Sequence, residues 1–137
     1  MQAVFLFRIP VLYFFLIVLY HSEMKLHVFV LNKKELLKEV ISAYVEAGVP
    51  GATIIDSEGL GHFLTHKIPL FADFKNFMTG NTSGNKTIFS VVKDESVLPQ
   101  LEKLLDRICG GLSAPGTGII FTIPLDSCKG FTISEGI

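Results

Sequence analysis

The residues best suited to hold a ligand fall in two glycine sites. Gly59-Leu60-Gly61 follows an apolar segment of the chain, and Gly116-Thr117-Gly118 precedes another. Glycines at strand ends let backbone N–H groups approach an anion, as phosphate-binding loops do. Tight turns use the same residues, so either site alone is a weak signal. The pair indicates a candidate anion site if the fold is one in which a long loop starts at the first glycine site.

His62 and His66 are the second group with possible chemistry. They are four residues apart and would share one face of a helix, as a two-point metal site requires. We find no Cys, Asp or Glu that completes such a site, so we interpret them as exposed loop histidines and predict no metal. The chain also lacks Gly-x-Ser-x-Gly, a Walker lysine, HExxH and an oriented Cys/His pair. We therefore predict no catalytic residues and no enzyme activity.

Hydrophobic residues are unevenly distributed along the 137-residue chain. They make up 49% of it, with a mean hydropathy of +0.48, and 17 of the first 20 residues belong to this set. The remainder is about 44% hydrophobic, which is ordinary for a globular domain. We divide the chain into a hydrophobic extension, residues 1–23, and one domain, residues 24–137. The extension is open to three interpretations: an over-extended translation start, a membrane anchor or a cleaved signal.

The charge balance and the cysteines indicate which classes of partner and which cellular compartment to expect. The 12 basic and 13 acidic residues nearly balance, which removes the electrostatic drive for binding nucleic acid. Cys109 and Cys128 lack metal-site spacing, and Cys109 lies on the apolar side of a predicted helix. We therefore predict free thiols, no nucleic-acid partner and a cytoplasmic location. We expect membrane association only if residues 1–20 belong to the native protein.

The elements that position these sites follow from hydrophobic periodicity. Short apolar runs predict four strands, and apolar residues at three- and four-residue spacing predict two amphipathic helices. Asp94 is a plausible N-cap of the second helix, and glycines close both helices. The expected strands are Lys25–Leu31, Thr53–Ser57, Lys86–Val92 and Ile119–Ile123; the expected helices are Lys33–Ala47 and the segment from Asp94 to Ile108.

The order strand–helix–strand–strand–helix–strand is typical of the α+β, ferredoxin-like split βαβ sandwich. We therefore expect a four-stranded antiparallel sheet with two helices on one face. A long connection, residues 61–86, interrupts the pattern between the second and third strands. Its Phe-rich stretch at 70–78 has helical spacing. We expect it either to pack on its own domain or on a neighbouring subunit, or to dock a partner or cover a ligand.

At this point the chain resembles the PII nitrogen-regulatory signalling superfamily, from Met24 to about Pro124. The resemblance rests on the element order, the long loop, and the segments Ala47–Thr53, Gly59–Gly61 and Gly116–Pro124. It implies a homotrimer that binds adenine nucleotides in clefts between subunits, with 2-oxoglutarate as a common co-effector. It also implies that the loop after the second strand, called the T-loop, contacts a transporter, enzyme or regulator.

Several positions depart from the family pattern. His62-Phe63 stands where Arg-Gln follows the first glycine site, Ile119 stands where Lys follows the second, and the basic C-terminal strand is reduced to Lys129. The long loop contains no tyrosine, so the family's tyrosine modification has no acceptor here. A PII-like protein with a changed ligand, or with none, fits these departures.

We therefore expect a PII-like regulatory trimer. The alternative is a structural or interaction trimer of the CutA type, without a nucleotide and with the Phe-rich loop as a fixed contact. The expected effector is of the adenine-nucleotide type, and loop 62–85 is expected to report its presence. The expected ligand residues are Gly59, Gly61, Val91, Gly116, Thr117 and Gly118, and the expected partner-binding residues are His62, Phe63, Phe71, Phe74 and Phe77.

Overall fold

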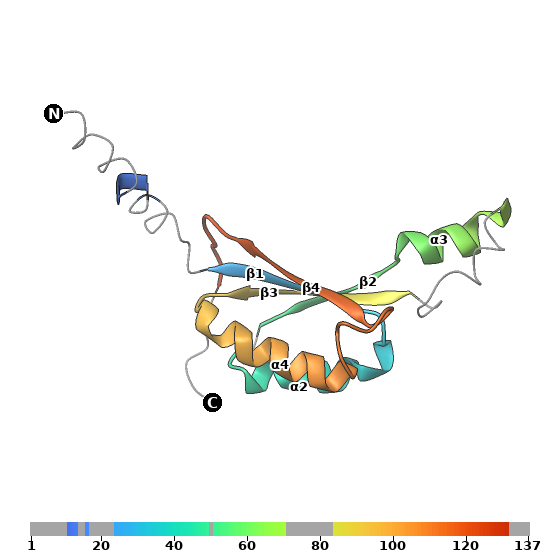
Figure 1. Ribbon diagram of the computed structural model, residues 1–137, viewed down its shortest axis with the longest axis horizontal. Coiled ribbons are helices and arrows are strands. Elements are labelled where there is room, and N and C mark those ends of the chain that lie inside the picture. The colour runs from blue at the N-terminus through green and yellow to red at the C-terminus, as the bar shows by residue number, and fades with distance from the viewer. Residues whose placement is uncertain (1–10, 14–15, 17–23, 50, 71–83, 132–137) are drawn as a thin grey trace.

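The computed structural model of the chain describes residues 11–13, 16, 24–49, 51–70 and 84–131. Four strands and three helices of eight residues or more form residues 24–131 (Figure 1). Two short 3-10 turns precede two of these helices. In chain order the elements are β1 (Lys25–Leu31), η1 (Lys34–Leu36), α2 (Leu37–Glu46), β2 (Thr53–Ser57), α3 (Leu60–Lys67), β3 (Asn85–Val92), η3 (Glu95–Val97), α4 (Leu98–Cys109) and β4 (Gly118–Pro124).

The strands form one antiparallel sheet in the order β2-β3-β1-β4. Helices α2 and α4 lie together on one face of it, whereas α3 extends from one end of the sheet (Figure 1). The predicted ferredoxin-like fold is therefore confirmed. β1 lies between β3 and β4 and pairs with both. Its last residue, Leu31, therefore lies beside the start of each neighbour, at Lys86 of β3 and Gly118 of β4.

The core lies between the sheet and the two helices. Phe29 and Leu31 of β1 and Ile88 of β3 are fully buried there, against Leu101 and Leu105 of α4. Successive strand residues point to opposite faces, so alternate residues of each strand supply this layer. The apolar stripes of α2 and α4 pack against these strand residues and complete the core on this face of the sheet.

The helix boundaries follow from local backbone chemistry. Asp94 accepts a hydrogen bond from the Ser96 amide at 2.9 Å and so caps the 3-10 turn η3, which leads into α4; the N-cap residue of α4 itself is Val97. At the start of η1 the N-cap residue is Lys33, which makes no side-chain cap hydrogen bond. Helix α4 ends at Cys109, and its C-cap residue Gly110 has a left-handed φ of 75°, which suits glycine.

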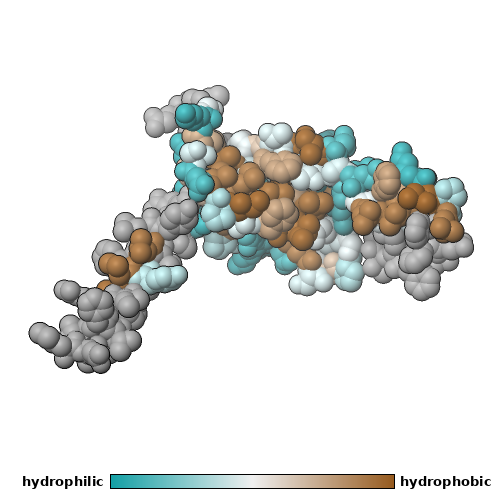
Figure 2. All heavy atoms as spheres, turned by 90° about the horizontal axis from the view of Figure 1, so that it is seen from above, coloured by the Kyte–Doolittle hydropathy of each residue, from teal (hydrophilic) through white to brown (hydrophobic). Residues whose placement is uncertain are grey.

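The opposite face of the sheet carries apolar side chains and no helix among the described residues. Figure 2 looks onto this face, and hydrophobic residues gather over the strands. On β4, Ile119, Phe121 and Ile123 are 57%, 42% and 45% exposed, and Ile55 of β2 is 45% exposed. We call these four residues the open-face cluster. An apolar surface of this kind is typical of an interface.

Helix α3 replaces part of the expected long loop. It begins at Leu60 and includes Gly61 in its first turn, so the first glycine site leads directly into a helix rather than into a tight turn. The helix expected at 70–78 lies almost entirely outside the described residues, as do Phe71, Phe74 and Phe77. In the described part of the chain, no helix is both long and apolar enough to cross a bilayer.

A histidine is buried between the sheet and α2. His27 is fully buried, and its Nδ1 lies 2.9 Å from the hydroxyl oxygen of Tyr44. Its Nε2 has no hydrogen-bond partner among the described residues. Burial lowers the pKa of His27 from 6.5 to about 4. Burial raises the pKa of Tyr44, which therefore keeps its proton.

This burial predicts an acid-sensitive fold. Below pH 6.5 the unfolded chain protonates His27, while the folded chain resists protonation until about pH 4. Folding stability is therefore complete above 6.5 and falls as the pH drops to about 4, by a total of about 3 kcal/mol. Denaturant unfolding across this window should show that decline in the wild type and in Tyr44→Phe, and should show it greatly reduced in His27→Gln. An undiminished decline in His27→Gln would contradict the account.

Candidate functional site

The register of the sheet brings the two glycine sites to one end. Ser57, the last residue of β2, pairs with Asn85, the first residue of β3, and Gly118 pairs with Leu31 at the end of β1. Gly59 lies just beyond β2, and Gly116 lies just before β4. Both sites therefore lie at the end of the sheet from which α3 extends (Figure 1). We call this the glycine end.

Two asparagines link the glycine sites across the sheet. Asn32 donates from Nδ2 to the Gly116 carbonyl at 3.0 Å, and Asn85 donates from Nδ2 to Asn32 Oδ1 at 3.2 Å. The Ser57 hydroxyl donates to Asn85 Oδ1 at 2.7 Å. These hydrogen bonds run from β2 through β3 and β1 to the loop before β4. They form a continuous polar chain that fixes the two glycine sites relative to each other.

Sequence reasoning did not identify this polar chain. Neither Asn32 nor Asn85 is among the ligand residues expected from motifs and spacing. The signal that would have found them is their position: each lies at a strand end, and the expected antiparallel order places those ends side by side. That inference needs the register as well as the elements.

The second glycine site is tightly packed against β1. A Cβ at Gly118 would collide with the carbonyl oxygen of Val30 and approach Cε2 of Phe29 to 3.1 Å. Thr117 is 1% exposed, and its carbonyl accepts a hydrogen bond from the Asn32 amide at 3.3 Å. Thr117 therefore holds the loop in place, while Gly116 stays half-buried with a left-handed φ of 75°.

The first glycine site forms the N-terminus of α3. Gly59 is the N-cap residue, and its carbonyl accepts the Phe63 amide at 3.0 Å. The first turn of a helix presents backbone N–H groups that have no intrahelical partner, and the helix dipole favours negative charge there. Phe63 is exposed, and His62 is half-buried. The expected residues Gly59 and Gly61 thus lie where backbone donors are available.

Two lysines and two carboxylates lie near the glycine end. Lys86 of β3 bonds the Asp56 carboxylate at 2.6 Å. That hydrogen bond, together with the charges of Lys86 and then Lys34, lowers the pKa of Asp56, so this carboxyl stays ionised. Glu58, the residue before Gly59, pairs with His62. Lysine and carboxylate charges are therefore nearly balanced here, and the backbone N–H groups are the main donors available to an anion.

Val91, the remaining expected ligand residue, lies at the other end of the sheet. It pairs with Leu26, whereas Gly118 pairs with Leu31, so the two are about 17 Å apart along the strand direction. A mostly apolar hollow of about 340 Å³ lies beside Val91. It is lined by Val45, Gly48, Val49, Gly51, Val91, Val92, Lys93, Asp94, Val97 and Phe131. One protomer therefore does not bring Val91 to the glycine end.

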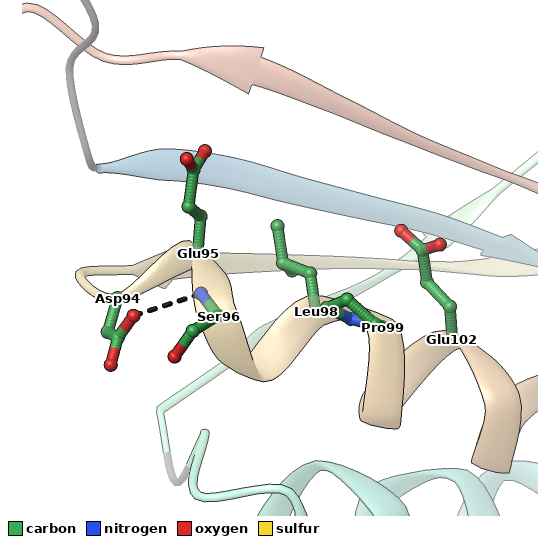
Figure 3. A pocket seen from close by; sticks show the side chains of 6 residues that line it. All are labelled: Asp94, Glu95, Ser96, Leu98, Pro99 and Glu102. Atoms are coloured by element: carbon green, nitrogen blue, oxygen red, sulfur yellow. Dashed lines mark hydrogen bonds between the residues drawn. The ribbon is translucent and has the colours of Figure 1, made fainter.

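A larger hollow of about 690 Å³ lies at the start of α4 (Figure 3). In that view Glu95 and Glu102 point toward the sheet, and the Asp94 carboxylate turns back to the Ser96 amide. Glu95 also pairs with Lys25 at 3.3 Å. Three carboxylates in one open hollow would repel a phosphate group. We therefore place no anionic ligand there.

The thiol chemistry agrees with the sequence analysis. Both cysteines are free, and Cys109 is fully buried in the core. Burial raises the pKa of the Cys109 thiol, which makes it a poor nucleophile. Cys109 therefore has a packing role, as predicted.

Comparison with known proteins identifies the family. The model of the family described as nitrogen regulatory protein P-II matches residues 24–134. This chain belongs to the P-II family. The computed structure is similar to that of Arabidopsis thaliana PII bound to citrate, with 18% identity, a TM-score of 0.50, and coverage of 76% of this chain and 78% of that one.

A second similar structure is that of a functionally unknown protein from Pediococcus pentosaceus ATCC 25745. It has 15% identity and a TM-score of 0.53, and the match covers 81% of this chain and all of that one. At such identities the two structures show the fold alone. No curated protein matches the sequence. The family match agrees with the resemblance found in the sequence, and the chain is a PII-like regulatory protein.

The close packing of Gly118 predicts a strong position-specific effect. Gly118→Ala should lower the free energy of unfolding by about 1–3 kcal/mol, because the new methyl group must displace backbone atoms of β1. Gly51→Ala is the matched control, since a Cβ there meets nothing within 4 Å, and its effect should stay within about 0.5 kcal/mol. Urea unfolding at one protein concentration measures both. If both substitutions lowered the free energy of unfolding equally, the start of β4 would not be tightly packed against β1.

Proposed function

We propose that this P-II family member senses a small anionic effector, of the adenine-nucleotide class, and signals through the segment after β2. The observation that carries the proposal is the polar chain at the glycine end. Asn32 and Asn85 hold the two glycine sites together at the N-terminus of α3. Backbone donors, lysines and an adjoining loop then lie in one place, as a phosphate sensor requires. Nothing in this arrangement calls for catalysis.

The open-face cluster supports assembly into a homotrimer. Four large apolar side chains are between 42% and 57% exposed on a sheet face that no described helix covers. Burying apolar surface contributes about 25 cal/mol per Å², so this face favours contact with identical faces of other subunits. P-II family membership supports three as their number. The sheets would then face one another inside the trimer, with the helices outside.

The separation of Val91 from the glycine end supports clefts between subunits. The two positions are about 17 Å apart along one sheet, so they form a single site only if they come from different protomers. We propose that the glycine end of one subunit meets the Val91 hollow of its neighbour. Gly59, Gly61, Gly116 and Gly118 would supply phosphate-binding backbone groups, and the apolar hollow would receive the base.

Helix α3 gives such an effector a direct route to the signalling segment. It begins one residue after Gly59, so a ligand at the glycine end would contact its first turn. We propose that occupancy selects one arrangement of residues 62–85, which a protein target such as a transporter, an enzyme or a regulator then recognises. His62 and Phe63 lie at the start of that segment, and Phe71, Phe74 and Phe77 would continue the contact. The free thiols support a reducing, cytoplasmic setting.

A ligand-free trimer of the CutA type is the second candidate. The burial of Thr117 and the apolar side chain of Ile119 favour it, because neither residue offers a side-chain contact to a phosphate. In that case the loop would act as a fixed contact rather than a reporter. The two candidates differ in one measurable property, which is nucleotide binding.

Calorimetric titration with adenine mono-, di-, tri-, cyclic and dinucleotides, with and without 2-oxoglutarate, should reveal at least one ligand. Asn32→Ala should weaken binding about tenfold, the equivalent of about 1.4 kcal/mol, because the link to Gly116 is lost. Ser42→Ala removes an exposed hydrogen bond on α2, to the Lys38 carbonyl, and should leave binding unchanged. No response to any nucleotide would refute the sensor and favour the ligand-free trimer.

The proposed homotrimer leads to a separate prediction about the mass of the protein in solution. The wild-type protein should have the mass of a trimer in light scattering coupled to size exclusion, and Phe121→Lys should dissociate it by burying a charge in the interface. Ser42→Lys places the same charge on an exposed residue of α2, on the helix side of the sheet, so it should leave the trimer intact. A monomeric wild type would contradict the proposed clefts.

A further inference from the structure

A phenylalanine beyond the last strand lines the apolar hollow beside Val91. Phe131 is half-buried, whereas four of the six residues between β4 and Phe131 are exposed. The other two, Leu125 and Cys128, are half-buried as well, so every third residue of this segment turns inward. The Leu125 amide donates to the Met24 carbonyl at 3.1 Å, which ties the segment to the residue before β1. The segment after β4 therefore places its single aromatic ring at the hollow.

A cation lies over the Phe131 ring. Lys93 Nζ is 4.7 Å from the ring centroid, which is within the range of a cation–π contact. Both residues line the hollow. The face of an aromatic ring carries partial negative charge, and this charge attracts the ammonium group. The contact gives a defined position to a ring that belongs to no helix or strand.

The rest of the hollow is mainly aliphatic. Its volume of about 340 Å³ falls within the range of small-molecule sites, which is about 300–1,000 Å³. Among the described lining residues, Phe131 is the only aromatic one and Asp94 the only carboxylate. The aliphatic walls come from five valines: Val45, Val49, Val91, Val92 and Val97. Aliphatic walls with one aromatic ring suit a flat, uncharged ring better than a charged or flexible group.

We propose that Phe131 is the residue on which the planar ring of the ligand stacks, and that this ring displaces the Lys93 ammonium group. The inference rests on the proposed function and specifies how the hollow would hold the base. Stacking of a base on an aromatic side chain improves binding about five- to 150-fold, whereas an exposed cation–π contact contributes about two- to fivefold. The ligand ring therefore replaces Lys93 on the face of Phe131.

This role concerns affinity and not the choice of base. Every base has a π-face, so stacking tolerates any of them. Loss of the Phe131 ring should therefore weaken an adenine nucleotide and its inosine counterpart by the same factor. A residue that recognised the edge of the base would instead affect the two unequally.

The first test uses fluorescence. The chain contains no tryptophan, so Phe131→Trp introduces a single one at the hollow. Titration of this variant with AMP, ADP, ATP and cyclic AMP should change the tryptophan emission, because the indole stacks on the base. Ribose 5-phosphate, which has no base, should leave the emission unchanged. Ser127→Trp is the matched control, since Ser127 is exposed in the same segment and its emission should not respond. An equal response from both variants would contradict stacking at Phe131.

The second test is calorimetry of the full chain with the same four nucleotides. Phe131→Ala should weaken binding at least about fivefold. Phe131→Leu keeps an apolar side chain and removes only the aromatic ring, so it should weaken binding about two- to twelvefold. Ser127→Ala should leave the affinity unchanged, and circular dichroism verifies that all variants fold.

The outcomes separate this inference from the sensing function. If the wild type binds a nucleotide and Phe131→Ala and Phe131→Leu bind it equally tightly, Phe131 does not stack on the base and the sensor stands. If the wild type binds none of the nucleotides, both proposals are wrong.

Discussion

Two helices cover one face of a four-stranded sheet and leave the other face apolar, and the rest of the structure depends on that constraint. The helix side is complete, with Phe29, Leu31 and Ile88 fully buried. The other side presents Ile119, Phe121 and Ile123 to solvent because β4 also alternates apolar residues on its outer face. A single chain has no described element to cover them. The proposed assembly would cover these side chains, and it would also determine where ligand sites can form.

The antiparallel register explains why the two glycine sites lie at the same end of the sheet. A slip of one residue would move every side chain to the opposite face, so the buried face fixes the register strongly. That register places the ends of β1 and β2 beside the starts of β3 and β4. Asn32 and Asn85 then reach across the strand ends, and Gly118 fits against the Val30 carbonyl. The candidate site is thus a consequence of core packing.

Sequence patterns predicted the layers well and the site only in part. β1 and β2 have the predicted bounds, because short apolar runs between turn residues are unambiguous. Helix α3 was missed because it is short and its first turn contains Gly61, which resembles a bend. Asn32 could not be placed, since its partner Gly116 is 84 residues away and their contact depends on register. The position of Val91 at the far end likewise required the sheet order.

The central claim is that the glycine end of one subunit and the Val91 hollow of the next form one cleft. A crystal structure of the assembled protein, grown with an adenine nucleotide, tests it most directly. The account predicts three subunits with their open-face clusters buried, and Val91 of each neighbour beside Gly116 and Gly118 of the next. A structure in which the open faces stay exposed, or in which Val91 lies far from every glycine end, would contradict it.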